Sequence, residues 1–345
     1  MYSIPAEIIN EVTSLLLLAF IGFAVSMLAT PIYTFFAYKF KFWKVQRTTS
    51  TTGEKAAVFA KLHAEKHQRH IPTMAGMVFV AVVALMTLAF NLNRAETWLP
   101  LAALIGGGIV GLIDDVINIR GLGGGVRGLR SGVKFLLIAL VAAVAAWFFY
   151  YKLGFTSVHI PYLPFELELG WLIIPIFIFV VVAMGNAVNI SDGLDGLAGG
   201  LAAISFGTFG IIAMFQGQSY LAAFCFTVVG ALTAYLWFNI YPARFFMGDV
   251  GSFALGTALG VVAMLTNTLF LLPIIGLVFV IEAGSSSIQL LSKKFLGRKV
   301  FISAPIHHHL EATGWPETKI TMRFWLLAQI CAAIGLIIFL TGGYV

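Results

Sequence analysis

The sequence predicts an all-α integral membrane protein, organised as a single polytopic domain over residues 1–345. Hydrophobic residues make up 60% of the chain and charged residues only 10%, whereas a soluble domain carries about 25% charged residues. Apolar runs of about 18–25 residues recur along the chain, each long enough to cross a ~30 Å hydrocarbon core. None of these runs alternates with a period of two, so membrane helices are expected rather than a β-barrel.

About ten such runs are present, and each is expected to form one transmembrane helix. The runs at 196–214, 219–238 and 250–266 are separated by short loops, so their boundaries are the least distinct. Cys225 and Cys331 lie inside apolar runs and are expected to be buried thiols without a disulfide or metal site. The ten expected spans are 13–37, 72–90, 99–116, 133–151, 170–189, 196–214, 219–238, 250–266, 269–291 and 323–342.

The basic residues predict the orientation of these spans. Of the 21 Lys and Arg residues, 19 fall in four loops that the ten spans place on one side of the membrane: 38–71, 117–134, 239–249 and 292–323. By the positive-inside rule this side is cytoplasmic, and both termini are non-cytoplasmic. The same rule explains the basic loops without nucleic acid, so no nucleic-acid partner is expected.

All five aspartates of the chain fall on the predicted cytoplasmic side, at span ends or in short loops. The opposite side carries glutamates instead. Carboxylates that gather at one membrane face from three separate parts of the sequence predict an active site at that face. The five aspartates are Asp114, Asp115, Asp192, Asp195 and Asp249.

The first acidic motif, "GLIDDVINIRG", places Asp114 and Asp115 at the end of the third span. Two adjacent, half-desolvated carboxylates repel each other, so either a cation compensates them or one holds a proton, as a general base with a raised pKa would. A solvated helix end with spare acids is the alternative. It is the weaker one, because acids oppose the dipole at a helix C-terminus.

The second motif, "NAVNISDGLDGLAGG", spaces Asn189, Asp192 and Asp195 three residues apart, near one face of a helical turn. Gly193 and Gly196 would let the backbone bend and approach a ligand closely. Asp195 could instead cap the next helix. Capping would explain one aspartate but not three polar residues in register.

The third motif, "FFMGDVGS", places Asp249 where another span begins at the cytoplasmic face. Free N–H groups at such helix N-termini favour an anionic substrate group. Carboxylates beside a bound anion are best explained by a hard cation between them. Mg²⁺, held by one or two carboxylates and substrate phosphates, is the expected cofactor, and Mn²⁺ could substitute for it.

The fourth motif, "SAPIHHHLEATGWPE", puts His307, His308 and His309 in one expected cytoplasmic loop with Glu311. Three consecutive imidazoles do not easily share one zinc ion, so phosphate contact or proton transfer is favoured over a metal site. Glu282, inside the ninth expected span, is a functional candidate because it is an intramembrane acid. A hydrogen bond to a neighbouring helix explains it equally well.

With these motifs in view, the chain resembles the polyprenyl-phosphate N-acetylhexosamine-1-phosphate transferases, and within them the phospho-N-acetylmuramoyl-pentapeptide branch. "IPTMAG", the adjacent aspartates, "GLRSGVK", "NAVNISDGLDGLA", "WFN…FFMGDVGS" and "PIHHHLEATGWPE…RFW" follow the family's landmarks in order, from about residue 70 to 325. The unbroken histidine run with "GWPE" favours the muramoyl branch over the N-acetylglucosamine branch. Ten spans is also the number that the family has.

The resemblance implies transfer of phospho-MurNAc-pentapeptide from UDP-MurNAc-pentapeptide to undecaprenyl phosphate in the bacterial inner membrane, giving lipid I and UMP with Mg²⁺. It implies Asp249 and Asp192 at the metal, Asp114 as candidate base and Asp115 as its supporting carboxylate, although which aspartate is the base stays open. It also suggests a homodimer. The implied substrate contacts are Asn189, Asp192, Asp195, Asn239 and Phe246 around the uridine and diphosphate, and Lys134, His307, His308 and His309 at phosphates or the sugar-peptide.

The chain departs from the family pattern in two places. Asn118 stands where the family usually has Lys, a cation that Arg120 could replace. The looser "KLHAEKHQRHIPTMAGM" leaves open whether Lys66, Arg69 or His70 serves the family's lid role. Three alternatives to the muramoyl transferase are an N-acetylglucosamine-1-phosphate transferase, a silent scaffold and a transporter. A transporter would place its acids near the bilayer midplane, which only Glu282 fits.

Overall fold

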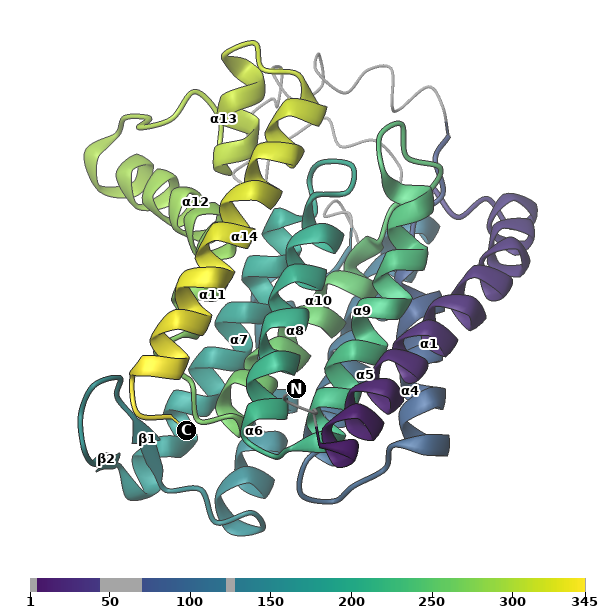
Figure 1. Cartoon of the computed structure of the whole chain (residues 1–345). Helices are drawn as coiled ribbons and strands as arrows, with labels where there is room; N and C mark the ends of the chain where they lie inside the picture. The colour runs from purple at the N-terminus through teal and green to yellow at the C-terminus, as the bar shows by residue number, and fades with distance from the viewer. Residues whose placement is uncertain (1–4, 44–69, 122–127, 345) are drawn as a thin grey trace.

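The structure is a computed structural model that describes residues 5–43, 70–121 and 128–344. Long helices packed side by side form the body of the molecule (Figure 1). In the described part, eight helices are long and apolar enough to cross a membrane, which confirms the all-α polytopic class. They are α1 (Ala6–Lys39), α5 (Trp98–Arg120), α6 (Ser131–Tyr151), α7 (Ile173–Ser191), α8 (Leu197–Phe215), α9 (Ser219–Asn239), α10 (Gly248–Leu265) and α14 (Glu317–Thr341).

Shorter elements complete the fold. The helix α4 (Gly76–Phe90) is apolar but only 15 residues long. The strands β1 (Ser157–His159) and β2 (Glu166–Glu168) form an antiparallel hairpin in which Val158 pairs with Leu167. The remaining elements are the 3-10 turn η1 (Gly170–Leu172) and the helices α11 (Leu272–Ile275), α12 (Leu277–Leu296) and α13 (Ile306–Ala312).

The expected single span at 269–291 is wrong, because the chain divides at Gly276 into α11 and α12. Pro273 lies in the first turn of α11, where it fits, and Gly276 ends that helix by donating its N–H to the Leu272 carbonyl at 2.8 Å. The helix α12 then runs to Leu296 and leans away from the other helices (Figure 1). With its one glutamate and two lysines it falls outside the eight candidate spans, so the expected number of ten is not confirmed.

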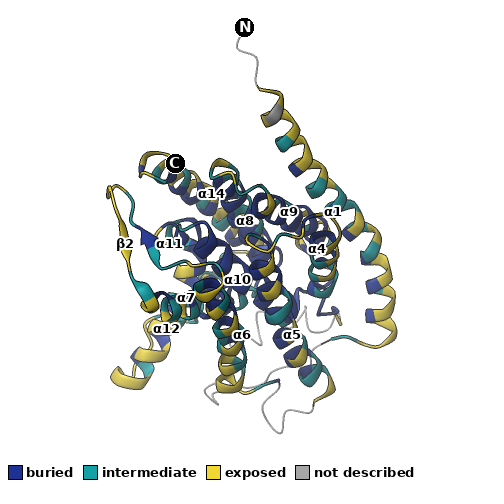
Figure 2. Cartoon of the chain, turned by 90° about the horizontal axis from the view of Figure 1, so that it is seen from below, coloured by how far each residue is buried: buried dark blue, intermediate teal, exposed yellow. Residues whose placement is uncertain are grey.

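The helix α10 forms the core of the molecule, and 94% of its 18 residues are buried (Figure 2). It packs closely on α5 because Gly107 and Gly111 present no side chain to it. A Cβ atom added at Gly111 would lie 2.0 Å from the carbonyl oxygen of Asp249. Small residues of this kind let two membrane helices approach closely. Through this contact the C-terminal half of α5 lies against the first turn of α10.

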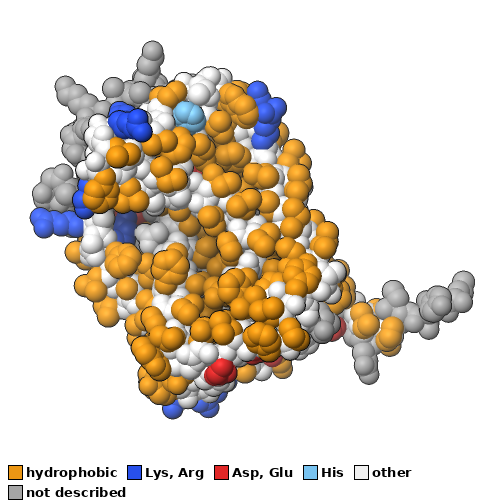
Figure 3. Space-filling model, turned by 90° about the vertical axis from the view of Figure 1, so that its left-hand side faces the viewer, with side chains coloured by type: hydrophobic (Ala, Val, Ile, Leu, Met, Phe, Trp, Pro, Cys, Tyr) orange, Lys and Arg blue, Asp and Glu red, His pale blue; other side chains and the backbone are white. Residues whose placement is uncertain are grey.

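The outer surface is largely apolar. On the face seen in Figure 3, hydrophobic side chains cover most of the area, and most Lys and Arg side chains lie in its upper half. The helix α1 is exposed along most of its length, with Leu28 and Phe20 facing outward. A surface of this composition suits a protein surrounded by lipid.

The two ends of the helix bundle differ. The β1–β2 hairpin and the C-terminus lie at the lower end in Figure 1, and α13 and the start of α14 lie at the upper end. Hydrogen bonds and ion pairs, described below, join the ends of α5, α7 and α9 to the starts of α6, α10 and α14. The five aspartates of the sequence motifs lie at or next to these helix ends.

Candidate functional site

A lysine between two aspartates forms the centre of the site. The Nζ atom of Lys134, in the first turn of α6, lies 2.7 Å from Oδ2 of Asp249 and 3.1 Å from Oδ2 of Asp114. The side chain of Asp114 is 1% exposed, that of Asp249 14% and that of Lys134 17%. One ammonium therefore compensates two carboxylates in a poorly solvated place, where their mutual repulsion would otherwise be strong. We call these three residues the carboxylate–lysine cluster.

The two adjacent aspartates of α5 face different partners. Asp114 accepts a hydrogen bond from the Leu129 N–H at 2.6 Å through its second oxygen. Asp115, which is fully buried, accepts one from the Val250 N–H at 3.1 Å. A carboxylate at a helix N-terminus is favourably placed toward the helix dipole. Asp115 thus fixes the first turn of α10, which carries Asp249.

Gly248 makes this arrangement possible. Its backbone has φ +75°, which side-chain-bearing residues rarely adopt. A Cβ atom at this position would lie 2.5 Å from Oδ2 of Asp115. Gly248, the first glycine of "MGDVGS", therefore allows the close contact between α5 and α10.

The end of α7 lies beside the carboxylate–lysine cluster. The side-chain amide of Asn189 donates to Oγ of Ser252, in the first turn of α10, at 2.9 Å. Asp192 ends α7, and its N–H donates to the Asn189 carbonyl at 3.3 Å. The structure therefore brings the second and third sequence motifs together at the start of α10.

Asp195 and Asn239 join the α7–α8 turn to the segment after α9. Asp195 accepts from the Ala243 N–H at 3.0 Å through Oδ2, and its own N–H donates to Oε1 of Glu317 at 2.5 Å. Asn239 accepts from the Gly196 N–H and donates to the Phe245 carbonyl, both at 2.9 Å. Both side chains are buried, so they shape the loops around the site.

The interpretation of Asp195 as a helix cap is wrong. Gly196, with φ +76°, is the N-cap residue of α8, and no side-chain hydrogen bond caps that helix. The Asp195 carboxylate is instead engaged by the 240–247 segment. The same segment carries Phe246, whose backbone exchanges hydrogen bonds with Pro72 and Ala75 of the "IPTMAG" motif at 2.8 and 3.1 Å.

The three histidines lie on the short helix α13 rather than in the expected loop. Pro305 precedes the helix as its N-cap residue and starts it, because proline is compatible with a helix start. Each ring has a different partner: His307 contacts Glu282 at 2.8 Å, His308 contacts Glu311 at 2.7 Å, and His309 accepts from the Ile302 N–H at 3.2 Å. The three rings are thus held by three different partners.

Some contributors were not identified from the sequence. Ser252 accepts a hydrogen bond from the Asn189 side chain, and Glu317 accepts one from the Asp195 N–H. The only sequence signal for Glu317 was its place in "GWPE". Asn118, at the departure from the family pattern, is buried in the last turn of α5, while Arg120 is exposed. His70 is exposed, and Lys66 and Arg69 lie outside the described residues.

The cluster offers hard oxygen ligands but not a complete protein cage for a metal. Among the described residues, no group of three or more His, Cys, Asp and Glu side chains is placed to hold a metal ion. Mg²⁺ does not require one, since it typically binds one or two carboxylates and takes its other ligands from water and phosphates. Oxygens of Asp114 and Asp249 already converge on one cationic atom. The donor set therefore fits Mg²⁺.

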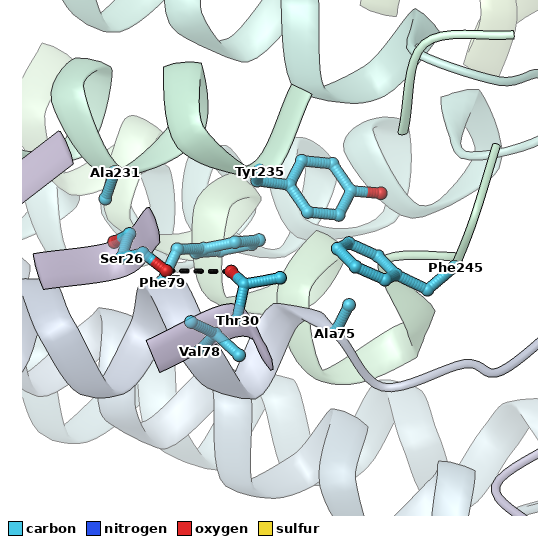
Figure 4. A pocket seen from close by; sticks show the side chains of 8 residues that line it. All are labelled: Ser26, Thr30, Ala75, Val78, Phe79, Ala231, Tyr235 and Phe245. Atoms are coloured by element: carbon cyan, nitrogen blue, oxygen red, sulfur yellow. Dashed lines mark hydrogen bonds between the residues drawn. The ribbon is translucent and has the colours of Figure 1, made fainter. Parts of the chain in front are cut away.

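A small cavity lies elsewhere, between α1, α4, α9 and the 240–247 segment (Figure 4). Its volume of about 10 Å³ is enough for about one water molecule. Thr30 donates to the Ser26 carbonyl at 2.7 Å on one side, and the rings of Phe79 and Phe245 close it (Figure 4). No charged residue lines it, so it is no candidate for binding a phosphate.

Comparison with known proteins adds an independent finding. The family model "Glycosyl transferase family 4" matches residues 97–267. The phospho-N-acetylmuramoyl-pentapeptide-transferase of Geobacillus thermodenitrificans is 39% identical over 326 residues, which are 92% of this chain and 95% of the relative. The protein of the same name from Chloroflexus aggregans is 37% identical over 344 residues, 96% of this chain and 91% of the relative. That from Bacillus velezensis is 38% identical over 324 residues, 92% and 95% respectively.

Proposed function

The chain belongs to the phospho-N-acetylmuramoyl-pentapeptide-transferase family, and we propose on this premise that it carries out the reaction that gives the family its name. In that reaction the phosphate oxygen of undecaprenyl phosphate attacks the phosphorus bonded to the sugar in UDP-MurNAc-pentapeptide. The bond from that phosphorus to UMP breaks, UMP leaves, and lipid I remains in the membrane. The protein then acts in peptidoglycan synthesis, at the cytoplasmic face of the bacterial inner membrane.

The carboxylate–lysine cluster is the observation in the structure that best supports this proposal. Phosphoryl transfer depends on positioning and charge neutralisation more than on covalent help from the protein. The cluster places one ammonium and two carboxylates within hydrogen-bonding distance at the end of three helices. A lipid-borne phosphate and a nucleotide arriving from the aqueous side would meet at such a helix end.

Asp114 and Lys134 of the cluster, and Asp115 beside it, each have a role in the proposal. Asp114 accepts a proton from the lipid phosphate when that phosphate is protonated, and its bond to Leu129 N–H keeps the carboxylate in place. Asp115 acts indirectly, by fixing the first turn of α10. Lys134 orients both carboxylates and adds positive charge beside the transferred phosphate.

Asp249 would hold Mg²⁺ together with Asp192 on the nucleotide side, and Asp114 would remain the base. The ion, when bound, neutralises charge on the diphosphate. Asp249 is the more exposed carboxylate of the cluster and lies in the first turn of α10.

The nucleotide side of the site is formed by the α7–α8 turn and the 240–247 segment. Asn189 and Asp192 end α7 next to α10. Asp195 and Asn239 hold the two segments together, and Phe246 would offer an aromatic face to the uracil ring. We therefore assign the uridine diphosphate to this turn.

The experiment that tests the reaction measures UMP release by the purified protein in detergent. We expect release only when UDP-MurNAc-pentapeptide, undecaprenyl phosphate and Mg²⁺ are all present. Omission of any one component, or addition of EDTA, should reduce release to background. Release of UMP without the lipid phosphate would indicate hydrolysis and contradict the transferase assignment.

A further inference from the structure

Glu282 is a buried acid that the proposed reaction does not use. It lies on α12 with 0% of its surface exposed, and its Oε2 lies 2.8 Å from Nδ1 of His307, which is also 0% exposed. Within the described part of the chain, its Oε1 has no hydrogen-bond partner. A carboxylate this deep costs several kcal/mol unless it is compensated. Its pairing with His307 supplies the compensation.

The second nitrogen of His307 faces the nucleotide side of the site. Its Nε2 is buried and also has no hydrogen-bond partner among the described residues. A Cβ atom added at Gly193 would lie 2.2 Å from this nitrogen, so the ring lies directly against the α7–α8 turn. Gly193 stands between Asp192 and Asp195. The pair thus links α12 and α13 to the turn that we assign to the diphosphate.

The charge of the pair determines what Nε2 can bind. A net-neutral pair is either an imidazolium with a carboxylate or a neutral ring with a protonated carboxyl group. In both of these forms Nε2 carries a hydrogen, whereas a neutral ring that donates from Nδ1 to an ionised Glu282 leaves Nε2 as an acceptor. The hydrogen bond made by one ring nitrogen generally decides the role of the other. An anionic oxygen is the ligand that fits the forms in which Nε2 carries a hydrogen, and this buried nitrogen has no other partner among the described residues.

We propose that Glu282 is a positioning residue, which holds His307 so that Nε2 faces the Gly193 turn and donates to an oxygen of the bound diphosphate. This inference rests on the proposed function for the identity of the diphosphate. His308 and Glu311 form a second histidine–carboxylate pair at 2.7 Å within α13. The inference concerns the Glu282 pair alone.

Steady-state kinetics of the full-length protein test this proposal. We expect Glu282→Ala to raise KM for UDP-MurNAc-pentapeptide about 10-fold, the lower end of what loss of a histidine-orienting carboxylate costs. KM for undecaprenyl phosphate should change less than twofold. Glu282→Gln, whose amide can still bond Nδ1, should recover most of the loss. Ser292→Ala, a buried change further along α12 whose hydroxyl donates to the Arg298 carbonyl and not to Glu282, should leave both KM values unchanged.

A double variant separates positioning from general damage. If Glu282 acts through His307, adding Glu282→Ala to His307→Ala should raise KM no further than His307→Ala does alone. Fully additive effects would overturn the proposal. Equal increases of both KM values, or no increase in Glu282→Ala, would overturn it as well.

Nuclear magnetic resonance of protein labelled with ¹⁵N-histidine keeps this test independent of turnover. The His307 ring signals, assigned by their loss in His307→Gln, should shift in Glu282→Ala and stay in place in Ser292→Ala. Unchanged signals in Glu282→Ala would overturn the positioning role. An active-site assay in which wild-type protein releases no UMP would instead overturn the proposed function, and the ring signals would still report on Glu282.

Discussion

At the scale of single residues, the site depends on Lys134. Its ammonium reaches Asp114 and Asp249 from a third helix, so the repulsion between the two carboxylates is offset only when α5, α6 and α10 are all in place. The sequence identified the two aspartates as candidates because charge is rare in an apolar chain, and the family resemblance added Lys134. It could not show that the lysine lies between the two aspartates, since residues 114, 134 and 249 are joined only by the tertiary fold.

Replacing Asp249 tests its role in the reaction. We expect Asp249→Asn to lower UMP release at least ~100-fold, because the substitution removes a charge where preorganised electrostatics act on the transferred phosphate. The protein should still fold, since Asp114 continues to compensate Lys134. The control is Glu168→Gln, an exposed acid in β2 at the other end of the molecule, which should have wild-type activity. Near-normal turnover in Asp249→Asn would remove Asp249 from the metal role.

Replacing Lys134 tests the charge balance itself. We expect Lys134→Met to destabilise the protein by about 3 kcal/mol, since it leaves the buried Asp114 carboxylate without its cation. Adding Asp114→Asn should restore part of the lost stability, because the uncompensated charge is then gone. Thermal unfolding in detergent measures both effects. If the double variant is no more stable than Lys134→Met, the ion pair is not the source of the loss.

At the scale of helices, the contact between α5 and α10 places the aspartates. Gly111 allows the backbone of α5 to approach the start of α10, and Asp115 then reaches the Val250 N–H. Glycines within an apolar run are visible in the sequence, but their partner helix is not. The structure supplies that partner, and with it the reason why Asp114 and Asp249 are neighbours.

A single added methyl group tests this contact. We expect Gly111→Ala to cost ~1–3 kcal/mol through overpacking and to reduce UMP release by moving Asp114 away from Asp249. Gly132→Ala is the matched control, because a Cβ atom there meets no atom within 4 Å. It should be neutral or slightly stabilising. Equal unfolding temperatures for the two variants would show that the close packing is unimportant.

Hydropathy predicted most helices to within a few residues, because lipid requires long apolar segments wherever they cross. It did not predict the break at Gly276 or the histidine helix α13. Both depend on local turn chemistry around Pro273 and Pro305, which a window average does not register. The role of Asp195 was also hidden, since its partners Ala243 and Glu317 are distant in sequence.

At the scale of the whole molecule, an apolar outer surface separates two polar ends (Figure 3). The end that carries α13 also carries the cluster, the α7–α8 turn and the exposed Lys319 and Arg323 at the start of α14. This arrangement suits an enzyme that joins a membrane-borne lipid to a water-soluble nucleotide. The homodimer suggested by the resemblance stays a prediction.

Cysteine labelling in spheroplasts tests the orientation of the molecule. The native Cys225 and Cys331 are buried, so they should contribute little background. By the positive-inside rule, a membrane-impermeant maleimide should label Glu168→Cys in intact spheroplasts. It should label Lys319→Cys, an exposed site at the start of α14, only after permeabilisation. The reverse pattern would place the cluster on the wrong side for a cytoplasmic nucleotide.

The measurement that tests the central claim most directly is a competition between two nucleotide substrates. Purified protein is given undecaprenyl phosphate and Mg²⁺ with equal amounts of UDP-MurNAc-pentapeptide and UDP-N-acetylglucosamine, and the lipid product is identified by mass spectrometry. We predict that undecaprenyl-diphospho-MurNAc-pentapeptide forms and the N-acetylglucosamine lipid does not. A product that carries only N-acetylglucosamine would contradict the muramoyl assignment.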